Sequence, residues 1–463
     1  MFRHSISYRC YTLAKIGLSL AYLWFISDFF RIHQAYWQGM SLLLPDPGAV
    51  ASSASFPFDL FLRGVAFVCH SKAAVWLILI ASPFAAGLFV WGHGKWIQLA
   101  VTGWLSCSMI AMVSFVGVFA SAADVWLHFA FVSYGVTLLL CPAEKWEERE
   151  PGFTLARWKQ DPVLSSSYAW LLVLIQFSVY FFAGVSKLVE GWDPWIGGYA
   201  IENLAFDSSM RDFVRGVHVP HLISWIFCYV TLFQRLIVPF GFFSMRLRGW
   251  AFLILVSMHL GYALLMRVAI FPVVGIAFLF MIVPPGLALP PFRASSLPRQ
   301  ERRKMTRGKE AALSRTSRLA IAVIVLFSGW LLFESSRIAL FGVVPVESQF
   351  MLAPAWRMFA SGGVQAGEKW RLLLMTPAGE VDGTDGVVRL LPHLWRDRFY
   401  LDVVLHGILD ESGTQQTLDQ PDPLLARVLS TGESHYRDRQ IQLQRDPTIL
   451  KSGFSLYRRA SAH

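Results

Sequence analysis

The feature that most constrains this chain is a series of apolar runs, each near 20 residues long, spread over residues 1–342. An α-helix of about 20 apolar residues spans the hydrocarbon core of a bilayer. Of the 463 residues, 55% are hydrophobic and only 16% are charged. Soluble domains carry about 25% charged residues and rarely contain several such runs. The sequence therefore predicts a polytopic membrane protein.

We expect an all-α membrane bundle of about nine transmembrane helices. Their expected ranges are 11–30, 73–91, 97–121, 125–141, 166–187, 222–243, 250–266, 268–284 and 319–341. The connection at 31–72 contains an amphipathic stretch, 56–68, which could lie in the interface or cap the bundle. The basic N-terminus precedes a run without a convincing cleavage site, so we expect an uncleaved first helix.

Basic residues gather in the connections after the second, fourth, sixth and eighth expected helices. The positive-inside rule then places the N-terminus and these connections in the cytoplasm, including the basic linker 293–318. The loop that follows Lys187 and the tail at 343–463 would face the non-cytoplasmic side. This topology explains the net charge of +10, so we expect contact with membrane lipid and no nucleic-acid partner.

The tail at 343–463 is polar enough to form a small extramembrane α+β domain. The strands that we expect there are 369–375, 386–392 and an edge strand at 437–446, and the expected helices are 396–411 and 422–429. The two predicted domains are thus the bundle at 1–342 and the tail at 343–463.

The cysteines predict no disulfide framework. They are Cys10, Cys69, Cys107, Cys141 and Cys228. No CxxC pair is present, and most lie in or beside apolar runs, so we expect buried free thiols. No His and Cys grouping has structural-zinc spacing, and a loop is the favoured interpretation of His218 and His221. We therefore expect no metal.

Lys187 ends the apolar run that begins at 171. Two fates are open to an ammonium at this position. It can reach the interface as an anchor, or it can stay partly dry, which favours the neutral amine that acts as a base. Ala183 and Gly184, one turn earlier, are small enough to allow a close helix contact. A lysine beside such a contact is more often turned towards the bundle than towards lipid.

The residues around Lys187 resemble a known family signature. The stretch 180–188 reads YFFAGVSKL, 195–199 reads WIGGY, and Glu202 precedes Leu204 by two positions. This block resembles the signature of vitamin K-dependent gamma-glutamyl carboxylases and, equally, of their bacterial HTTM relatives (horizontally transferred transmembrane domain). His259, with Phe271 twelve residues on, resembles that family's histidine-containing helix pair.

The resemblance implies that Lys187 is the base that deprotonates a quinol, with reduced vitamin K or menaquinone as cofactor. In the carboxylases, oxygenation of the quinol then drives proton abstraction from glutamate and addition of CO2. The segment 119–129 lacks the carboxylases' Asn-His pair. The resemblance therefore implies a quinol-type base and leaves carboxylation of protein glutamate open.

Other polar residues complete the predicted site. His259 is either a hydrogen-bonded bundle residue or a second catalytic group beside Lys187. Gln234 and Arg235 interrupt an apolar run, and an intramembrane arginine is functional or paired, here with Glu202 or Asp193. The residues expected to bind substrate are Trp195, Gly198, Tyr199, Glu202, Gln234 and Arg235.

Three functions remain open from the sequence. The first is a carboxylase-like lyase or oxygenase-type enzyme that binds a lipidic quinol and uses Lys187 as base. The second is a non-catalytic membrane protein that carries lipid or assists an exported protein or peptide through its C-terminal domain. The third is a transporter, which is disfavoured because no strong internal repeat or pair of broken helices is visible.

Overall fold

A computed structural model describes the helical part of the chain and four C-terminal strands. The described residues are 4–37, 71–140 except 93 and 117–121, 150–283 except 191, 206–209, 212, 215, 267 and 269, then 285, 315–341, 369–376, 379–382, 439–440 and 454–459. The amphipathic stretch 56–68 and most of the linker 293–318 lie outside the described residues.

Eight of the described helices are long and apolar enough to cross a bilayer. They are α1 (Tyr8–Trp37), α4 (Lys72–Trp91), α5 (Lys95–Val116), α6 (Ala122–Leu140), α9 (Ser167–Glu190), α12 (His221–Leu236) with its 3-10 extension η3 (Val238–Phe243), α13 (Arg248–Leu265) and α16 (Arg315–Phe341). Each begins within a few residues of its expected start. The expected multi-pass helical membrane protein is therefore confirmed.

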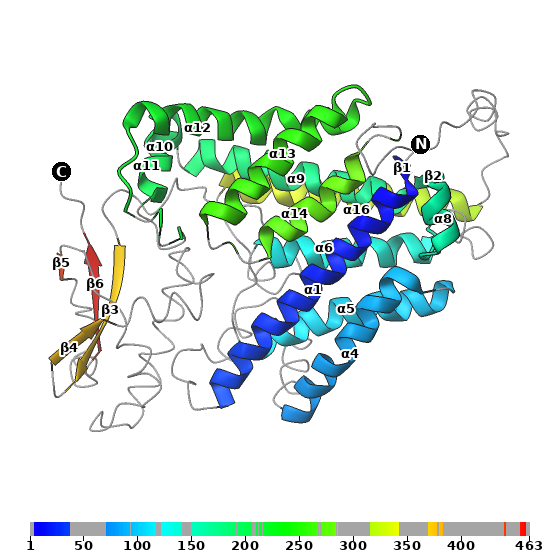
Figure 1. Ribbon diagram of the computed structural model, residues 1–463, viewed down its shortest axis with the longest axis horizontal. Coiled ribbons are helices and arrows are strands. Elements are labelled where there is room, and N and C mark those ends of the chain that lie inside the picture. Colours follow the sequence, from blue (N-terminus) through cyan, green and yellow to red (C-terminus); the bar gives the residue numbers. More distant parts are fainter. Residues whose placement is uncertain are drawn as a thin grey trace.

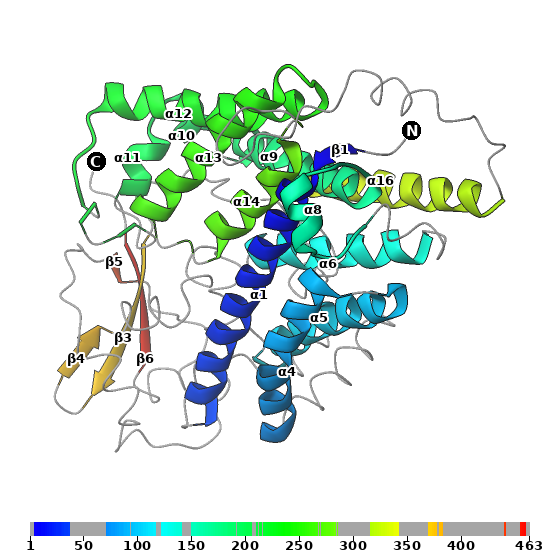
Figure 2. The same cartoon turned by 45° about the vertical axis from the view of Figure 1, so that its right-hand side comes forward.

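The helices form two groups that meet at α9. In Figures 1 and 2, α4 and α5 lie together beside α1 and α6, whereas α12 and α13 lie at the opposite end of the bundle. Helix α9 packs against α6, α12 and α16, and 78% of its spanning segment is buried inside the protein. It is therefore shielded from lipid by its neighbours, and polar groups on it face protein.

The expectation of nine full-length spans is wrong for the region 268–284. The structure has a shorter apolar helix there, Phe271–Ile282, made of α14 (Phe271–Leu279) and the 3-10 turn η4 (Phe280–Ile282). Proline explains both limits. Pro272 occupies the first turn, and Pro284 follows the last described residue of the segment, where a helix ends readily. The resulting length of about 18 Å falls short of the hydrocarbon thickness of about 30 Å.

A small two-stranded sheet ties the N-terminus to the start of α9. Strand β1 (His4–Ser7) pairs antiparallel with β2 (Val163–Ser166), beside the short helix α8 (Leu155–Gln160). Asp161 ends α8 in the left-handed conformation (φ 47°), and its carboxylate accepts a hydrogen bond from the backbone N–H of Arg9 at 2.9 Å. The described part of the connection between α6 and α9, residues 150–166, is thus a collar beside the start of α1.

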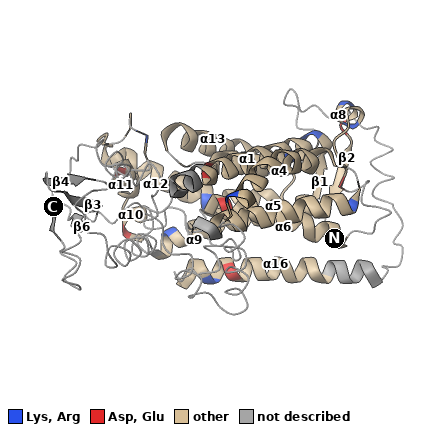
Figure 3. Cartoon of the chain, turned by 90° about the horizontal axis from the view of Figure 1, so that it is seen from below, with Lys and Arg blue, Asp and Glu red and all other residues tan. Residues whose placement is uncertain are grey.

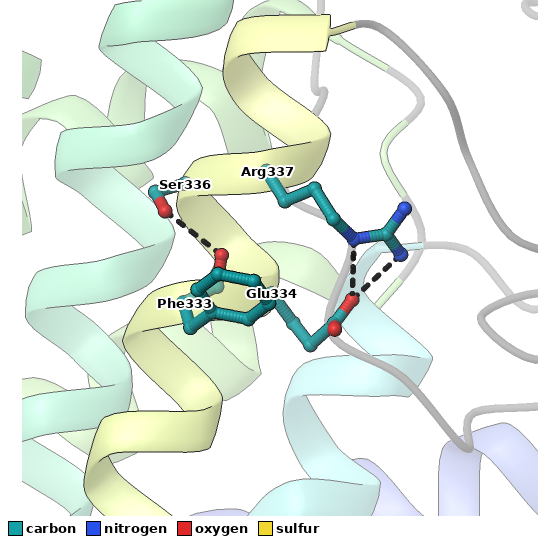
Figure 4. A network of polar contacts seen from close by, with 4 residues as sticks. All are labelled: Phe333, Glu334, Ser336 and Arg337. Atoms are coloured by element: carbon teal, nitrogen blue, oxygen red, sulfur yellow. Dashed lines mark hydrogen bonds and ion pairs between the residues drawn. The ribbon is translucent and has the colours of Figure 1, made fainter.

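Charged side chains are sparse along the described spans, as Figure 3 shows. Helix α16 carries one acid–base pair near its C-terminal end, drawn in Figure 4. Arg337 Nη2 donates to Glu334 Oε2 at 2.7 Å, and Ser336 Oγ donates to the carbonyl of Phe333 at 2.8 Å. The ion pair joins positions three residues apart, so it neutralises both charges within one helix.

The described part of the tail is a four-stranded antiparallel sheet in the order β4-β3-β6-β5. Its strands are β3 (Lys369–Thr376), β4 (Gly379–Asp382), β5 (Arg439–Gln440) and β6 (Phe454–Arg459). Strand β3 covers the strand expected at 369–375, and β5 falls on the expected edge strand. The strand expected at 386–392 and both helices expected in the tail lie outside the described residues.

Among the described cysteines, Cys10, Cys107 and Cys228 are free thiols. Cys10 and Cys228 are buried as expected, whereas Cys107 is exposed on α5. A thiol on the outer face of a spanning helix faces lipid, which an apolar run in the sequence does not distinguish from the bundle interior.

Candidate functional site

Lys187 lies inside the protein, in the last turn of α9. Its side chain is 1% exposed. The ammonium Nζ donates to the carbonyl of Ala183 at 3.4 Å and lies 5.0 Å from the centroid of the Trp195 ring. An anchoring lysine would extend its ammonium to the interface. The geometry therefore agrees with the second of the two expected fates, in which Lys187 stays dry.

Gly184 brings α9 and α12 into close contact beside Lys187. A Cβ added at Gly184 would lie 2.9 Å from Cβ of Arg235 and 2.8 Å from Cδ2 of Leu236. No side chain larger than hydrogen fits between the two helices at this level. The close helix approach expected from the Ala183-Gly184 pair is present, and it turns Lys187 into the bundle.

Two short helices connect α9 to α12 and cover the end of both. Helix α10 (Trp192–Ile196) and helix α11 (Ala200–Ala205) pack against α12. Trp195 is 1% exposed and belongs to a separate apolar cluster that includes Cys228 and Leu232 of α12. Because the Trp195 ring faces the Lys187 ammonium, Trp195 is the predicted loop residue that reaches the lysine.

Gly198 fixes the turn between α10 and α11. Its φ of +82° lies in the left-handed region, and an added Cβ would lie 2.9 Å from the Trp225 backbone. Ser224 Oγ donates to the carbonyl of Gly198 and accepts a hydrogen bond from the Glu202 backbone N–H at 3.0 Å. Gly198 therefore has a backbone role in holding the loop on α12.

Tyr199 and Glu202 meet His221 rather than the lysine. The Tyr199 ring stacks on the His221 ring, with centroids 4.4 Å apart, and Glu202 Oε2 lies 3.9 Å from His221 Nδ1. Arg235 has no ion pair among the described residues. The sequence suggested that Arg235 pairs with Glu202 or Asp193. Among the described residues, Arg235 pairs with neither.

Arg235 and His259 share two tyrosine neighbours in the bundle interior. The Tyr180 hydroxyl and His259 Nε2 are hydrogen-bonded at 2.5 Å. The Arg235 guanidinium lies 5.3 Å from the centroid of the Tyr180 ring and 5.9 Å from that of Tyr262, and its Nη2 donates to the Tyr262 hydroxyl at 3.3 Å. Arg235, His259 and Tyr180 are all fully buried.

Aromatic rings and one glycine hold the His259 imidazole in place. The Trp126 and Phe271 rings lie 6.2 and 4.9 Å from it, between centroids. A Cβ added at Gly275 of α14 would lie 2.1 Å from the imidazole, so only glycine admits the ring at this position. Trp126, Tyr180 and Gly275 could not be recognised from the sequence as neighbours of His259, because they come from three other helices.

Comparison with known proteins gives one match, to a domain family. Residues 105–286 match the family model of the HTTM domain. The chain contains an HTTM domain. This domain is the region shared with vitamin K-dependent carboxylase-like proteins. No curated protein and no solved structure matches the chain.

All eight predicted site residues lie within the HTTM domain. The structure brings Lys187 together with Trp195, and Arg235 together with His259. Gln234, the neighbour of Arg235 on α12, is only partly buried. Helices α1, α4 and α16 lie outside the matched segment and complete the bundle around it.

A second buried polar group lies where the N-terminus of the chain meets the HTTM domain. Glu150 is 1% exposed. Its carboxylate accepts hydrogen bonds from the Tyr11 hydroxyl at 2.8 Å and from Ser166 Oγ at 2.9 Å. Burial raises the pKa of Glu150, and these hydrogen bonds oppose the shift. Glu150 thereby joins α1, the collar and the start of α9.

Lys15 lies near Glu150 in an aromatic enclosure. It is 1% exposed, with Nζ 4.6 Å from the centroids of both the Phe89 and Tyr134 rings, and it donates to the Tyr134 hydroxyl at 3.3 Å. Lys15 is not among the predicted site residues, although a lysine within the first apolar run is a visible signal in the sequence.

The described residues contain no group of three or more His, Cys, Asp and Glu side chains that could hold a metal ion. The predicted site presents the buried amine of Lys187, the buried guanidinium of Arg235 and the buried imidazole of His259.

Proposed function

We propose that this protein binds a quinol-like or other lipidic molecule in its HTTM domain and uses Lys187 as a base. The observation that carries the proposal is the burial of Lys187 against Trp195 at the end of the most buried span. Burial disfavours a charged ammonium, so a dry lysine amine is suited to accept a proton from a weak acid.

The residues at the site fit a reduced quinol such as menaquinol. An aromatic ring, Trp195, lies beside the base, and Arg235 and His259 supply buried hydrogen-bond donors for oxygen atoms. When bound, a quinol supplies an acidic hydroxyl group. Lys187 Nζ would accept its proton, Trp195 would exclude water, and His259 would be oriented by Tyr180. This division of roles supports carboxylase-like or oxygenase-type chemistry.

The test is oxygen consumption and epoxide formation by the purified protein in nanodiscs supplied with reduced menaquinone. We expect turnover by the wild type and a loss of at least about a hundredfold in Lys187→Ala, which is the range of general-base contributions. Lys95→Ala is the matched control, because Lys95 also lies over a tryptophan, Trp96, at 5.4 Å. If Lys187→Ala turns over at the wild-type rate, Lys187 is not the base.

The non-catalytic alternative has a different outcome in the same experiment. A protein that only carries lipid would retain bound lipid and show no turnover in either the wild type or Lys187→Ala. Deletion of 345–463 would then decide whether the tail recognises an exported protein or peptide, because a pull-down interaction would depend on it.

A further inference from the structure

The bundle interior contains buried hydrogen-bond donors that have no acceptor. Arg235 Nε and Nη1 and His259 Nδ1 are buried and make no hydrogen bond with any described residue. Only Nη2 of the guanidinium is engaged, with the Tyr262 hydroxyl. Buried polar groups in proteins are nearly always paired, so unpaired ones require an explanation.

The unpaired arginine nitrogens are donors in every protonation state of the protein. In the tautomer in which the Tyr180 hydroxyl donates to Nε2, the single proton of a neutral His259 lies on Nδ1, which is then a third unpaired donor. A fully buried guanidinium with no carboxylate partner in the described structure is also an uncompensated positive charge.

Both residues lie at membrane depth. Arg235 belongs to the candidate span His221–Phe243 and His259 to the span Arg248–Leu265. The outer face of α12 is apolar, with Phe233 and Ile237 exposed on either side of buried Arg235. A ligand that neutralises the charge of Arg235 must therefore pass through an apolar environment and still present acceptor oxygens.

We infer that Arg235, His259 and Tyr262 form a subsite for the oxyanion head of an amphiphile, a carboxylate or a phosphate. The inference rests on the proposed binding of a lipidic molecule and, for a molecule other than a quinol, names its head group as an oxyanion. Arginine presents several N–H groups in a planar fork that suits both head groups. Tyr180 acts as a positioning residue, because its hydrogen bond to Nε2 orients the His259 imidazole.

The experiment uses the full chain in detergent and follows its thermal unfolding with four probes. The probes are oleate, oleoyl-lysophosphatidate, inorganic phosphate and, as the neutral control of matched chain length, oleyl alcohol. We expect both acidic amphiphiles to raise the Tm and oleyl alcohol to leave it unchanged. If inorganic phosphate alone also raises the Tm, the subsite binds a free anion. If it does not, the subsite binds the head group of a lipid.

Three variants test the assignment to Arg235. Arg235→Gln should weaken binding of the acidic amphiphiles about tenfold or more, as expected for a lost charge-assisted hydrogen bond. Arg235→Lys should retain part of it. Arg248→Gln is the matched control, because Arg248 is also buried but donates to the carbonyl of Phe242 at 2.7 Å, away from the subsite.

Two outcomes would overturn the inference. One is an equal Tm shift with oleyl alcohol, and the other is unchanged oleate binding in Arg235→Gln. If Arg235→Gln fails to fold, native mass spectrometry of the wild type decides, because a retained acidic lipid supports the subsite and its absence contradicts it. Lys187→Ala should still bind oleate. Turnover in that variant therefore tests the role of Lys187 as base, and oleate binding tests the subsite separately.

Discussion

At the scale of single residues, glycines decide which polar side chains can meet. Gly184 sets the contact between α9 and α12 beside Lys187, and Gly275 leaves room for the His259 imidazole against α14. Gly198 differs from both, because its positive φ and its closeness to the Trp225 backbone exclude a side chain on two independent grounds. The loop that carries Trp195 to the lysine depends on this one residue.

We predict that Gly198→Ala lowers the Tm of the purified protein. The left-handed conformation costs a residue with a Cβ about 1–2 kcal/mol, and the Trp225 backbone must also shift. Thermal unfolding in detergent measures the effect. Gly103→Ala is the control, because a Cβ added there meets nothing within 4 Å and alanine favours a helix. Equal Tm values for the two variants would contradict the assigned role of Gly198.

Much of the residue-scale picture could be predicted from the sequence. The small pair before Lys187 predicted the close helix contact, and the tryptophan that follows was placed at the site. The contact of Tyr199 with His221 and the enclosure of Lys15 could not be predicted. Both depend on which residues of distant segments face each other, and hydrophobic patterns over one segment do not contain that information.

At the scale of elements, the N-terminal strand β1 depends on a buried histidine. His4 is 2% exposed, and its pKa is lowered to about 3 by burial and, to a smaller extent, by the charge of Arg248. The ordinary value for histidine is 6.5. The stability that His4 contributes is therefore complete above pH 6.5 and is lost as the pH falls from 6.5 towards 3.

We predict that His4→Gln flattens the dependence of Tm on pH between 6.5 and 4.5. In the wild type, protons bind the unfolded chain at His4 more readily than the folded protein, so acidification destabilises the fold. Glu150, whose pKa is raised, acts in the opposite sense but is present in both proteins, so the comparison isolates His4. His218→Gln, at an exposed position, should keep the wild-type profile. Parallel profiles for wild type and His4→Gln would refute the prediction.

Element lengths show where sequence patterns succeed and fail. Long uninterrupted apolar runs predicted the starts of eight helices within a few residues. The run at 268–284 has the same composition, but Pro272 and Pro284 confine its helix to Phe271–Ile282. Helix α14 is held in the bundle by packing instead, since a Cβ added at Gly17 of α1 would lie 2.7 Å from Cβ of Ala277.

At the scale of the whole molecule, the short α14–η4 segment determines the predicted sidedness of the tail. If the segment completes a crossing, the basic linker 293–318 returns to the cytoplasm and the tail lies on the other side. If it does not, the linker and its many arginines are exported, against the positive-inside rule. The charge distribution therefore favours a crossing, which so short a helix can complete where the bilayer is locally thinned.

We predict that a periplasm-active reporter fused after Ala360 is active in a bacterial host and that one inserted in the linker at 300 is silent. The physical reason is retention of Lys- and Arg-rich connections in the cytoplasm. A fusion in the loop after Lys187 serves as the positive control for export. The reverse pattern, with an active linker fusion and a silent tail fusion, would show that α14 turns back within the bilayer.

The pairing of β1 with β2 also has a consequence for biosynthesis. Arg9 and its partner Asp161 are 152 residues apart in the chain. At translation rates of about 5–20 residues per second, the first strand waits roughly 8–30 s before its partner leaves the ribosome. During that interval the hydroxyl of Tyr11 has no Glu150 to bind. The nascent N-terminus therefore lacks its partners from the collar until residue 161 has been synthesised.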